Sequence, residues 1–324
     1  MLKIAVLAYE NCQLSGIGAI LDLFTLANWE YRRLNPQTKS PFCRCEVISV
    51  DGEPVNSFSR LPVQPKLAVQ GCLDANLIVI PGMMGRPEQL AEQTELIAWV
   101  NRQYQRGALV ASACSGAFLL AETGILNGRP ATTHWQLAER FRQRYPEVDL
   151  QIDRMLVDGE DYLCAGGGSA HFDLALYLLG KLGSEALATS CARTMLLDRS
   201  RSKQAPFMRF RGRKNHKDQP ILEVQQWLDR NYRNKVSIRE MAESFRMNER
   251  TLLRRFRKAT GEAPLEYLQR MRIETAKQLL ASKKDSLEEI TRYVGYEDVS
   301  SFRRLFREIV GMSPAAYRQR FSSW

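Results

Sequence analysis

Short apolar runs alternate with helical patterns through the first 200 residues. Nearly continuous apolar character over four or five residues is typical of strands that are buried on both faces. The runs are Ile4–Ala8, Val47–Val50, Leu77–Pro81 and Leu109–Ala113, and helical periodicity covers Ile17–Asn28, Glu88–Gln105 and Ser184–Leu197. The pattern predicts an α/β fold with helices on both faces of a parallel sheet, in which ligands bind at the carboxyl ends of the strands.

From Ile221 onward the pattern is helical and no strand signal returns. Two segments match at an offset of 50 residues, and a short upstream part matches at 49. The matched pairs include Phe256/Phe306, Arg257/Arg307, Gly261/Gly311, Pro264/Pro314 and Tyr267/Tyr317. Each copy predicts two helices joined by a short turn, which is the layout of a helix-turn-helix. The predicted helices are Ile238–Phe245 and Glu249–Ala259 in the first copy, and Leu287–Val294 and Val299–Ile309 in the second.

Charge separates the two halves. Residues 199–324 contain 29 Lys and Arg against 15 Asp and Glu, whereas residues 1–198 contain 17 against 21, so the net charges are +14 and −4. Clustered cations favour a polyanionic partner, because they release counterions from phosphates. We predict an N-terminal domain over 1–198, a flexible basic linker over 199–220 and an all-α domain over 221–324.

In the second helix of each copy, apolar residues face the core and leave a basic face outside. Arginine on such a face can pair with guanine or hold a phosphate. The predicted DNA-contacting residues are Arg250, Leu253, Arg254 and Arg257 in the first unit, and Ser300, Arg303, Arg304 and Arg307 in the second. The apolar Leu253 would contact a thymine methyl group.

These residues carry a family resemblance. The segment L-L-R-R-F-R-K-A-T-G-E-A-P-L-E-Y and its partner S-F-R-R-L-F-R-E-I-V-G-M-S-P-A-A-Y resemble the DNA-binding domain of AraC-type bacterial regulators. The resemblance covers about Ile221–Phe321. It implies that one long helix, near Pro264–Ala281, joins the units, and that both units enter successive major grooves of double-stranded promoter DNA.

Cys114 is the candidate for chemistry in the N-terminal domain. A strand leads straight into it and a helix begins at Ser115-Gly116, so a sharp strand-to-helix turn is predicted there. Such a turn exposes the side chain, and a helix N-terminus lowers the pKa of a thiol. The predicted ligand-binding residues are Gly82, Met83, Cys114, Ser115, His134, Gly167 and Gly168.

This block is similar to the DJ-1/PfpI superfamily, and more closely to its GlxA-like branch, in which the domain is fused to an AraC-type domain. The similarity implies a flavodoxin-like parallel sheet over most of residues 3–180. Enzymes of the superfamily support the cysteine with an acidic residue or a following histidine. Here Ser115 follows Cys114, and Gly16 stands at the acid position, with Glu10 as the nearest alternative. Without such a partner a cysteine is a poor catalyst.

We therefore predict a transcription regulator that senses a small molecule, and no enzyme. The resemblance implies a nitrogenous metabolite as that molecule. The resemblance implies an activator acting as a homodimer with RNA polymerase. A cysteine-dependent hydrolase or hydratase, with Cys114 as nucleophile, and a thiol redox sensor remain alternatives. No cofactor is indicated, and no residues have metal-ligand spacing. Seven cysteines without a C-x-x-C pair, and no signal peptide or long apolar stretch, favour a cytoplasmic protein without membrane contact.

Overall fold

The computed structural model describes residues 1–282 and 285–322. It divides into two compact units, Met1–Gln204 and Ala205–Trp324. The predicted C-terminal domain runs to residue 324, and its last two residues, like Lys283 and Lys284, lie outside the described residues.

The N-terminal unit is built on a seven-stranded sheet. Its strands, in spatial order, are β10 (Leu156–Asp158), β11 (Tyr162–Ala165), β7 (Leu109–Ala113), β6 (Leu77–Ile80), β1 (Leu2–Leu7), β2 (Cys43–Ser49) and β5 (Leu67–Ala68). All neighbours are parallel except β10 and β11. The predicted parallel α/β sheet is confirmed. The strand order reverses between β1 and β6, and in sheets of this topology ligands bind at the carboxyl ends of the strands at such a reversal.

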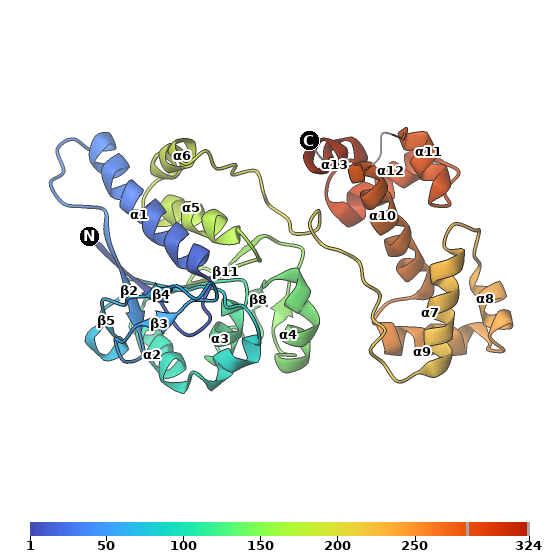
Figure 1. Cartoon of the computed structure of the whole chain (residues 1–324), viewed down its shortest axis with the longest axis horizontal. Coiled ribbons are helices and arrows are strands. Elements are labelled where there is room, and N and C mark those ends of the chain that lie inside the picture. The colour runs from blue at the N-terminus through green and yellow to red at the C-terminus, as the bar shows by residue number, and fades with distance from the viewer. Residues whose placement is uncertain (283–284, 323–324) are drawn as a thin grey trace. The chain divides into compact units, whose positions relative to one another are not determined.

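Helices cover both faces of this sheet (Figure 1). One face carries α1 (Leu14–Leu34), α5 (Ala170–Leu182) and α6 (Glu185–Thr194), and the other carries α2 (Thr94–Gln105) and α3 (Gly116–Glu122). The remaining elements are α4 (Ala138–Arg144) and the short strands β3 (Val55–Asn56), β4 (Pro62–Val63), β8 (Pro130–Ala131) and β9 (Asp149–Leu150). The predicted helix Glu88–Gln105 was wrong in its first turn, because Gln93 leaves the helical conformation between a 3₁₀ turn at Pro87–Glu92 and α2.

The C-terminal unit is all-α. Its helices are α7 (Gln219–Asn231), α8 (Ile238–Ser244), α9 (Glu249–Thr260), α10 (Pro264–Ser282), α11 (Leu287–Tyr293), α12 (Val299–Val310) and α13 (Pro314–Phe321). The two predicted helix-turn-helix units are α8–α9 and α11–α12, and the predicted joining helix is α10 (Figure 1).

Local capping explains why these helix ends were predictable. Ser237 with Glu240, and Ser286 with Glu289, form capping boxes at α8 and α11. Gly261 and Gly311 end α9 and α12 in the left-handed conformation, with φ of +89° and +82°.

The segment from Arg201 to Gly212 packs against folded structure, which differs from the flexible tether expected from its basic composition. At its start, Arg201 and Gln204 donate hydrogen bonds to Ser169 and Thr133 of the N-terminal unit. Its aromatic residues pack within the C-terminal unit, where Phe207 contacts Phe321 and Phe210 contacts Tyr267. Ala205 and Pro206 are buried and Phe210 is half-buried, so apolar residues among the basic ones supply burial that a charged linker lacks.

Candidate functional site

Cys114 forms the turn between β7 and α3. Its φ of +56° is unusual for a residue with a side chain. The Cys114 N–H donates to the carbonyls of Ala165 and Gly166 at 3.0 and 2.9 Å, and the Thr133 hydroxyl donates to the Cys114 carbonyl at 2.7 Å. The strand-to-helix turn predicted here is present, and neighbouring backbone holds it in place.

The thiol of Cys114 is nearly covered, with 9 % of the residue exposed. Burial raises the pKa of the thiol, although the backbone N–H groups of Ser115 and Gly168 hydrogen-bond the sulfur and oppose this rise. The predicted lowering of this pKa was wrong, because removal from water disfavours the thiolate more than two N–H groups stabilise it.

The carboxyl end of β6 packs directly against this turn. A Cβ atom at Gly82 would lie 2.9 Å from the Cβ of Cys114, so a side chain there would collide with the cysteine. The hydroxyl of Ser115 accepts from the Met83 N–H at 2.7 Å and donates to the Met83 carbonyl at 2.8 Å. Ser115 therefore braces the Gly82-Met83 loop.

The loop after β11 closes another side of the site. The imidazole of His134 lies against Gly167, where a Cβ atom would come within 1.4 Å of the ring carbon Cδ2. His134 Nδ1 accepts from the Gln136 N–H at 3.1 Å and so caps the 3₁₀ turn at Trp135–Leu137. All seven predicted ligand-binding residues thus belong to one set of contacts around Cys114.

Two neutral imidazoles belong to this region. Burial lowers the pKa of His134. His171 is 4 % exposed, and burial together with the nearby charge of Arg201 lowers its pKa to about 4. Its Nε2 has no hydrogen-bond partner in the described structure. A neutral imidazole of this kind can donate or accept a hydrogen bond but carries no charge.

Gly16 stands where the resemblance places the acid of related enzymes. A Cβ atom at Gly16 would lie 3.5 Å from the Pro81 Cβ and 3.8 Å from His171 Nδ1, which is ordinary contact. A larger side chain would therefore point toward the same strand end as Gly82. The other acid considered, Glu10, is exposed and accepts from the Asn56 N–H at 3.0 Å.

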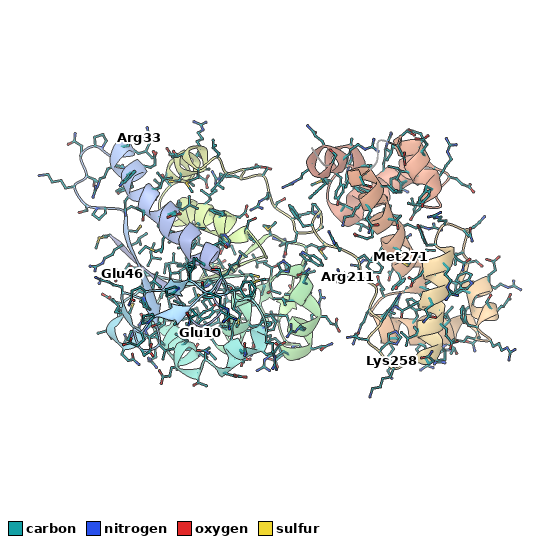
Figure 2. The ribbon with its side chains drawn as sticks, in the orientation of Figure 1. Glu10, Arg33, Glu46, Arg211, Lys258 and Met271 are labelled. Atoms are coloured by element: carbon teal, nitrogen blue, oxygen red, sulfur yellow. The ribbon has the colours of Figure 1, made fainter. Side chains whose placement is uncertain are left out.

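The eight predicted DNA-contacting residues lie on α9 and α12, and all eight are exposed. Leu252 and Phe256, like Phe302 and Phe306, turn inward and are fully buried. Lys258 extends from the end of α9 away from the domain (Figure 2). Both second helices therefore present a basic outer face.

Side-chain caps begin both helices. The Asn248 side chain accepts from the Thr251 N–H at 2.8 Å, and the Asp298 carboxylate accepts from the Ser300 N–H at 3.0 Å. Arg303 lies 3.9 Å from Glu288, and both side chains are more than half exposed. An exposed ion pair of this length contributes little stability, so Arg303 can exchange its partner for a phosphate or a base.

Comparison with known proteins agrees with both halves of this description. Residues 25–181 match the DJ-1/PfpI family, and residues 241–320 match a helix-turn-helix domain family. The chain is similar to the HTH-type transcriptional regulator CdhR of Pseudomonas aeruginosa, with 26 % identity over 85 % of this chain and 81 % of that protein. It is also similar to the HTH-type transcriptional regulator GlxA of Rhizobium meliloti, with 25 % identity over 74 % of each chain.

Among solved structures, an AraC family transcriptional regulator from Pseudomonas putida superposes with a TM-score of 0.52. It is 18 % identical, and the match covers 60 % of this chain and all of that one. The protein is an AraC-type transcription regulator with an N-terminal DJ-1/PfpI domain. The predicted family and fold are confirmed, and the two relatives named above are transcription regulators.

Sequence reasoning missed Gln204 of the regulator. This residue is 2 % exposed, and its side-chain amide donates to the Thr133 carbonyl at 2.8 Å and the Ile152 carbonyl at 3.0 Å. Its carbonyl oxygen accepts from the Gly167 N–H at 3.4 Å. Gln204 is far from these partners in sequence, and no local pattern marks it.

Within residues 1–282 and 285–322, no group of three or more His, Cys, Asp or Glu side chains could hold a metal ion. No described helix of the regulator is both long enough and apolar enough to cross a membrane.

Proposed function

We propose that this regulator responds to a small, nitrogen-containing metabolite that binds beside Cys114 and changes how α9 and α12 engage promoter DNA. The site combines a covered thiol, two neutral imidazoles and several backbone N–H groups with glycine at the acid position. Such a site can bind a ligand, but it lacks the acid that supports the cysteine in related enzymes. The missing acid is the observation that carries the sensing proposal.

The proposed ligand contacts are those expected from the sequence, together with the neutral His171. The proposed DNA contacts all lie on the exposed outer faces of α9 and α12, which we call the recognition helices. They are Arg250, Leu253, Arg254, Arg257, Ser300, Arg303, Arg304 and Arg307. We further propose that the regulator acts in the cytoplasm as a homodimeric activator that contacts RNA polymerase, as its resemblance to AraC-type regulators implies.

Selection of bound DNA tests the regulatory part. Purified full-length protein is mixed with sheared genomic DNA, and the recovered fragments are sequenced. We expect a shared motif with two half-elements about one helical turn apart, because the two recognition helices read successive grooves. Recovery of DNA without a motif would leave only nonspecific basic binding.

A thermal-shift screen tests the sensing part. Amino acids and quaternary amines are added singly to the full-length protein and to the Cys114→Trp variant. A metabolite that binds the folded state stabilises it by mass action and so raises the melting temperature. At a concentration a hundredfold above Kd, the free energy of unfolding increases by about 2.7 kcal/mol. We expect the shift to disappear in the variant, whose indole fills the site. A shift that persists would place the ligand elsewhere.

A further inference from the structure

The two helix-turn-helix units have separate hydrophobic cores. In the described part of the domain, one buried cluster gathers α7, α8 and α9, and the other gathers α11, α12 and α13. Helix α10 contributes Tyr267 and Leu268 to the first cluster and Ile273 and Ala276 to the second. In the described residues the two clusters share no buried residue and α10 spans both, so contacts where the clusters meet add to α10 in fixing the angle between α9 and α12.

Arg272 lies at this junction on α10, next to Met271, which is labelled in Figure 2. It is 8 % exposed. Its Nε donates to the Tyr232 carbonyl at 2.7 Å and its Nη2 donates to the Asn234 carbonyl at 2.8 Å, both in the segment that follows α7. Its guanidinium carbon lies 5.0 Å from the ring centre of Tyr296 in the second unit. A buried charge with these partners joins the two units.

Arg233 makes a second connection across the junction. Its guanidinium carbon lies 3.8 Å from the ring centre of Tyr293, and it donates a hydrogen bond to the Tyr293 hydroxyl. Arg233 follows α7, whereas Tyr293 ends α11 just before the turn that leads to α12. The first helix-turn-helix unit therefore contacts the turn that precedes α12.

Gly295 permits the close approach. A Cβ atom there would lie 2.5 Å from the Arg233 carbonyl oxygen, and the residue has φ of +86°. The corresponding residue of the first unit, Arg246, also has a positive φ of +52° but carries a side chain. The turn itself thus tolerates a side chain, and glycine at 295 serves the approach of the two units.

We propose that this inter-unit contact, formed by Arg233, Arg272, Tyr293, Gly295 and Tyr296, sets the spacing between DNA half-elements that the regulator accepts. The proposal rests on the proposed binding of DNA by both recognition helices. One inserted base pair rotates a half-element by roughly 34° and moves it by about 3.4 Å. If the inter-unit contact holds α9 and α12 in one relative orientation, they cannot both reach the displaced half-elements. Without the contact they can, but the effective concentration of the second helix-turn-helix unit at its half-element is lower.

The test compares spacing rather than overall affinity. Duplexes selected by the full-length protein from a random library are made with the selected spacing, with one inserted base pair, and as single half-elements. Tyr293→Ala removes the contact without removing charge, and Tyr293→Phe keeps the ring. Arg233→Ala removes the charged partner, and Arg230→Ala, an exposed arginine of α7, is its charge-matched control.

We expect the inserted base pair to weaken DNA binding by the wild-type protein and by Arg230→Ala about 30-fold or more. The same insertion should weaken binding by Tyr293→Ala and Arg233→Ala only about 3-fold. The last two variants should lose about tenfold in affinity at the selected spacing and keep wild-type affinity for single half-elements, with Tyr293→Phe between them and the wild type. Variants that keep the full insertion penalty, or a wild-type protein without one, overturn the proposal. Failure to select any DNA motif would instead count against the proposed function.

Discussion

At the level of single residues, Cys114 combines an unusual backbone conformation with a thiol that burial keeps protonated. A reactive cysteine needs a lowered pKa and access to solvent. Burial raises the pKa here, and 9 % exposure limits access. The geometry of a nucleophile turn has therefore been kept in a residue that is poorly suited to nucleophilic attack.

This difference predicts slow alkylation of Cys114. In iodoacetamide at pH 7.5, we expect Cys114 to react at least about tenfold more slowly in the folded protein than in the same protein unfolded in urea. Peptide mass spectrometry over a time course measures both rates, and the unfolded sample is the control for intrinsic reactivity. Faster reaction in the folded state would instead favour the redox-sensor or enzyme alternative.

His171 predicts a dependence of stability on pH. Its folded pKa of about 4 lies below the ordinary value of 6.5, so below pH 6.5 the unfolded chain binds a proton that the folded chain does not. Its neutral form favours folding above pH 6.5, and this contribution is lost as pH falls toward 4, by on the order of 2–3 kcal/mol.

The measurement is the urea midpoint at pH 7 and pH 4.5, followed by tryptophan fluorescence, to which the buried Trp99 of the N-terminal unit contributes. Carboxyl groups also titrate in this range, so the His171→Gln variant is the matched control. We expect the midpoint of the variant to fall less than that of the wild type. Equal falls would show that His171 takes up its proton without cost in the folded protein.

At the level of elements, the sequence predicted helices better than it predicted the sensor site. The ends of α8, α9, α11 and α12 lie within one residue of prediction, because capping side chains and glycines mark them locally. The short strands β3, β4 and β11 show no period and were not predicted, whereas β6, with four residues, was predicted from its continuous apolar run. The pKa of Cys114 and the role of Gln204 depend on burial and distant partners, which no local pattern contains.

The recognition helices allow a prediction about specificity. We expect Arg254→Ala and Arg304→Ala to cost roughly 1–3 kcal/mol on the selected motif and much less on mismatched DNA, as base contacts do. Arg211→Ala, which removes an exposed linker charge, should weaken all sequences alike and lower the salt slope by about one. Titrations at several salt concentrations separate the two behaviours. Equal losses on all DNA would assign Arg254 or Arg304 to a phosphate contact.

At the level of the whole molecule, one short segment contacts the N-terminal unit at its start and the C-terminal unit at its end. Gln204 is buried beside Thr133 and Gly167, which border the Cys114 site. A few residues later, the Phe210 N–H donates to Glu274 of α10 at 3.1 Å, and the Lys277 ammonium donates to the Met208 carbonyl. Gln204 and Phe210 are only six positions apart in the chain, so we expect displacement of one end to affect the other.

This attachment predicts that lengthening the segment will uncouple the two activities. We expect insertion of Gly-Ser-Gly-Ser between Gln204 and Ala205 to leave each unit folded, since the new residues lie between anchored ends. The variant should keep its DNA affinity without ligand and its melting-temperature shift with any metabolite found in the thermal screen. It should lose the effect of that metabolite on DNA affinity, because coupling requires that each ligand bias a shared conformational change.

Reciprocity sharpens this experiment. In the wild type, the metabolite and the selected duplex must change each other's affinity by the same factor, and in the inserted variant both factors should approach one. The same insertion after Gln37, in the exposed loop between α1 and β2, controls for added length and should leave the coupling intact. If the variant with the insertion after Gln204 retained the wild-type coupling factor, the coupling would not depend on this segment. The contacts of the segment with the two units would then contribute to stability alone.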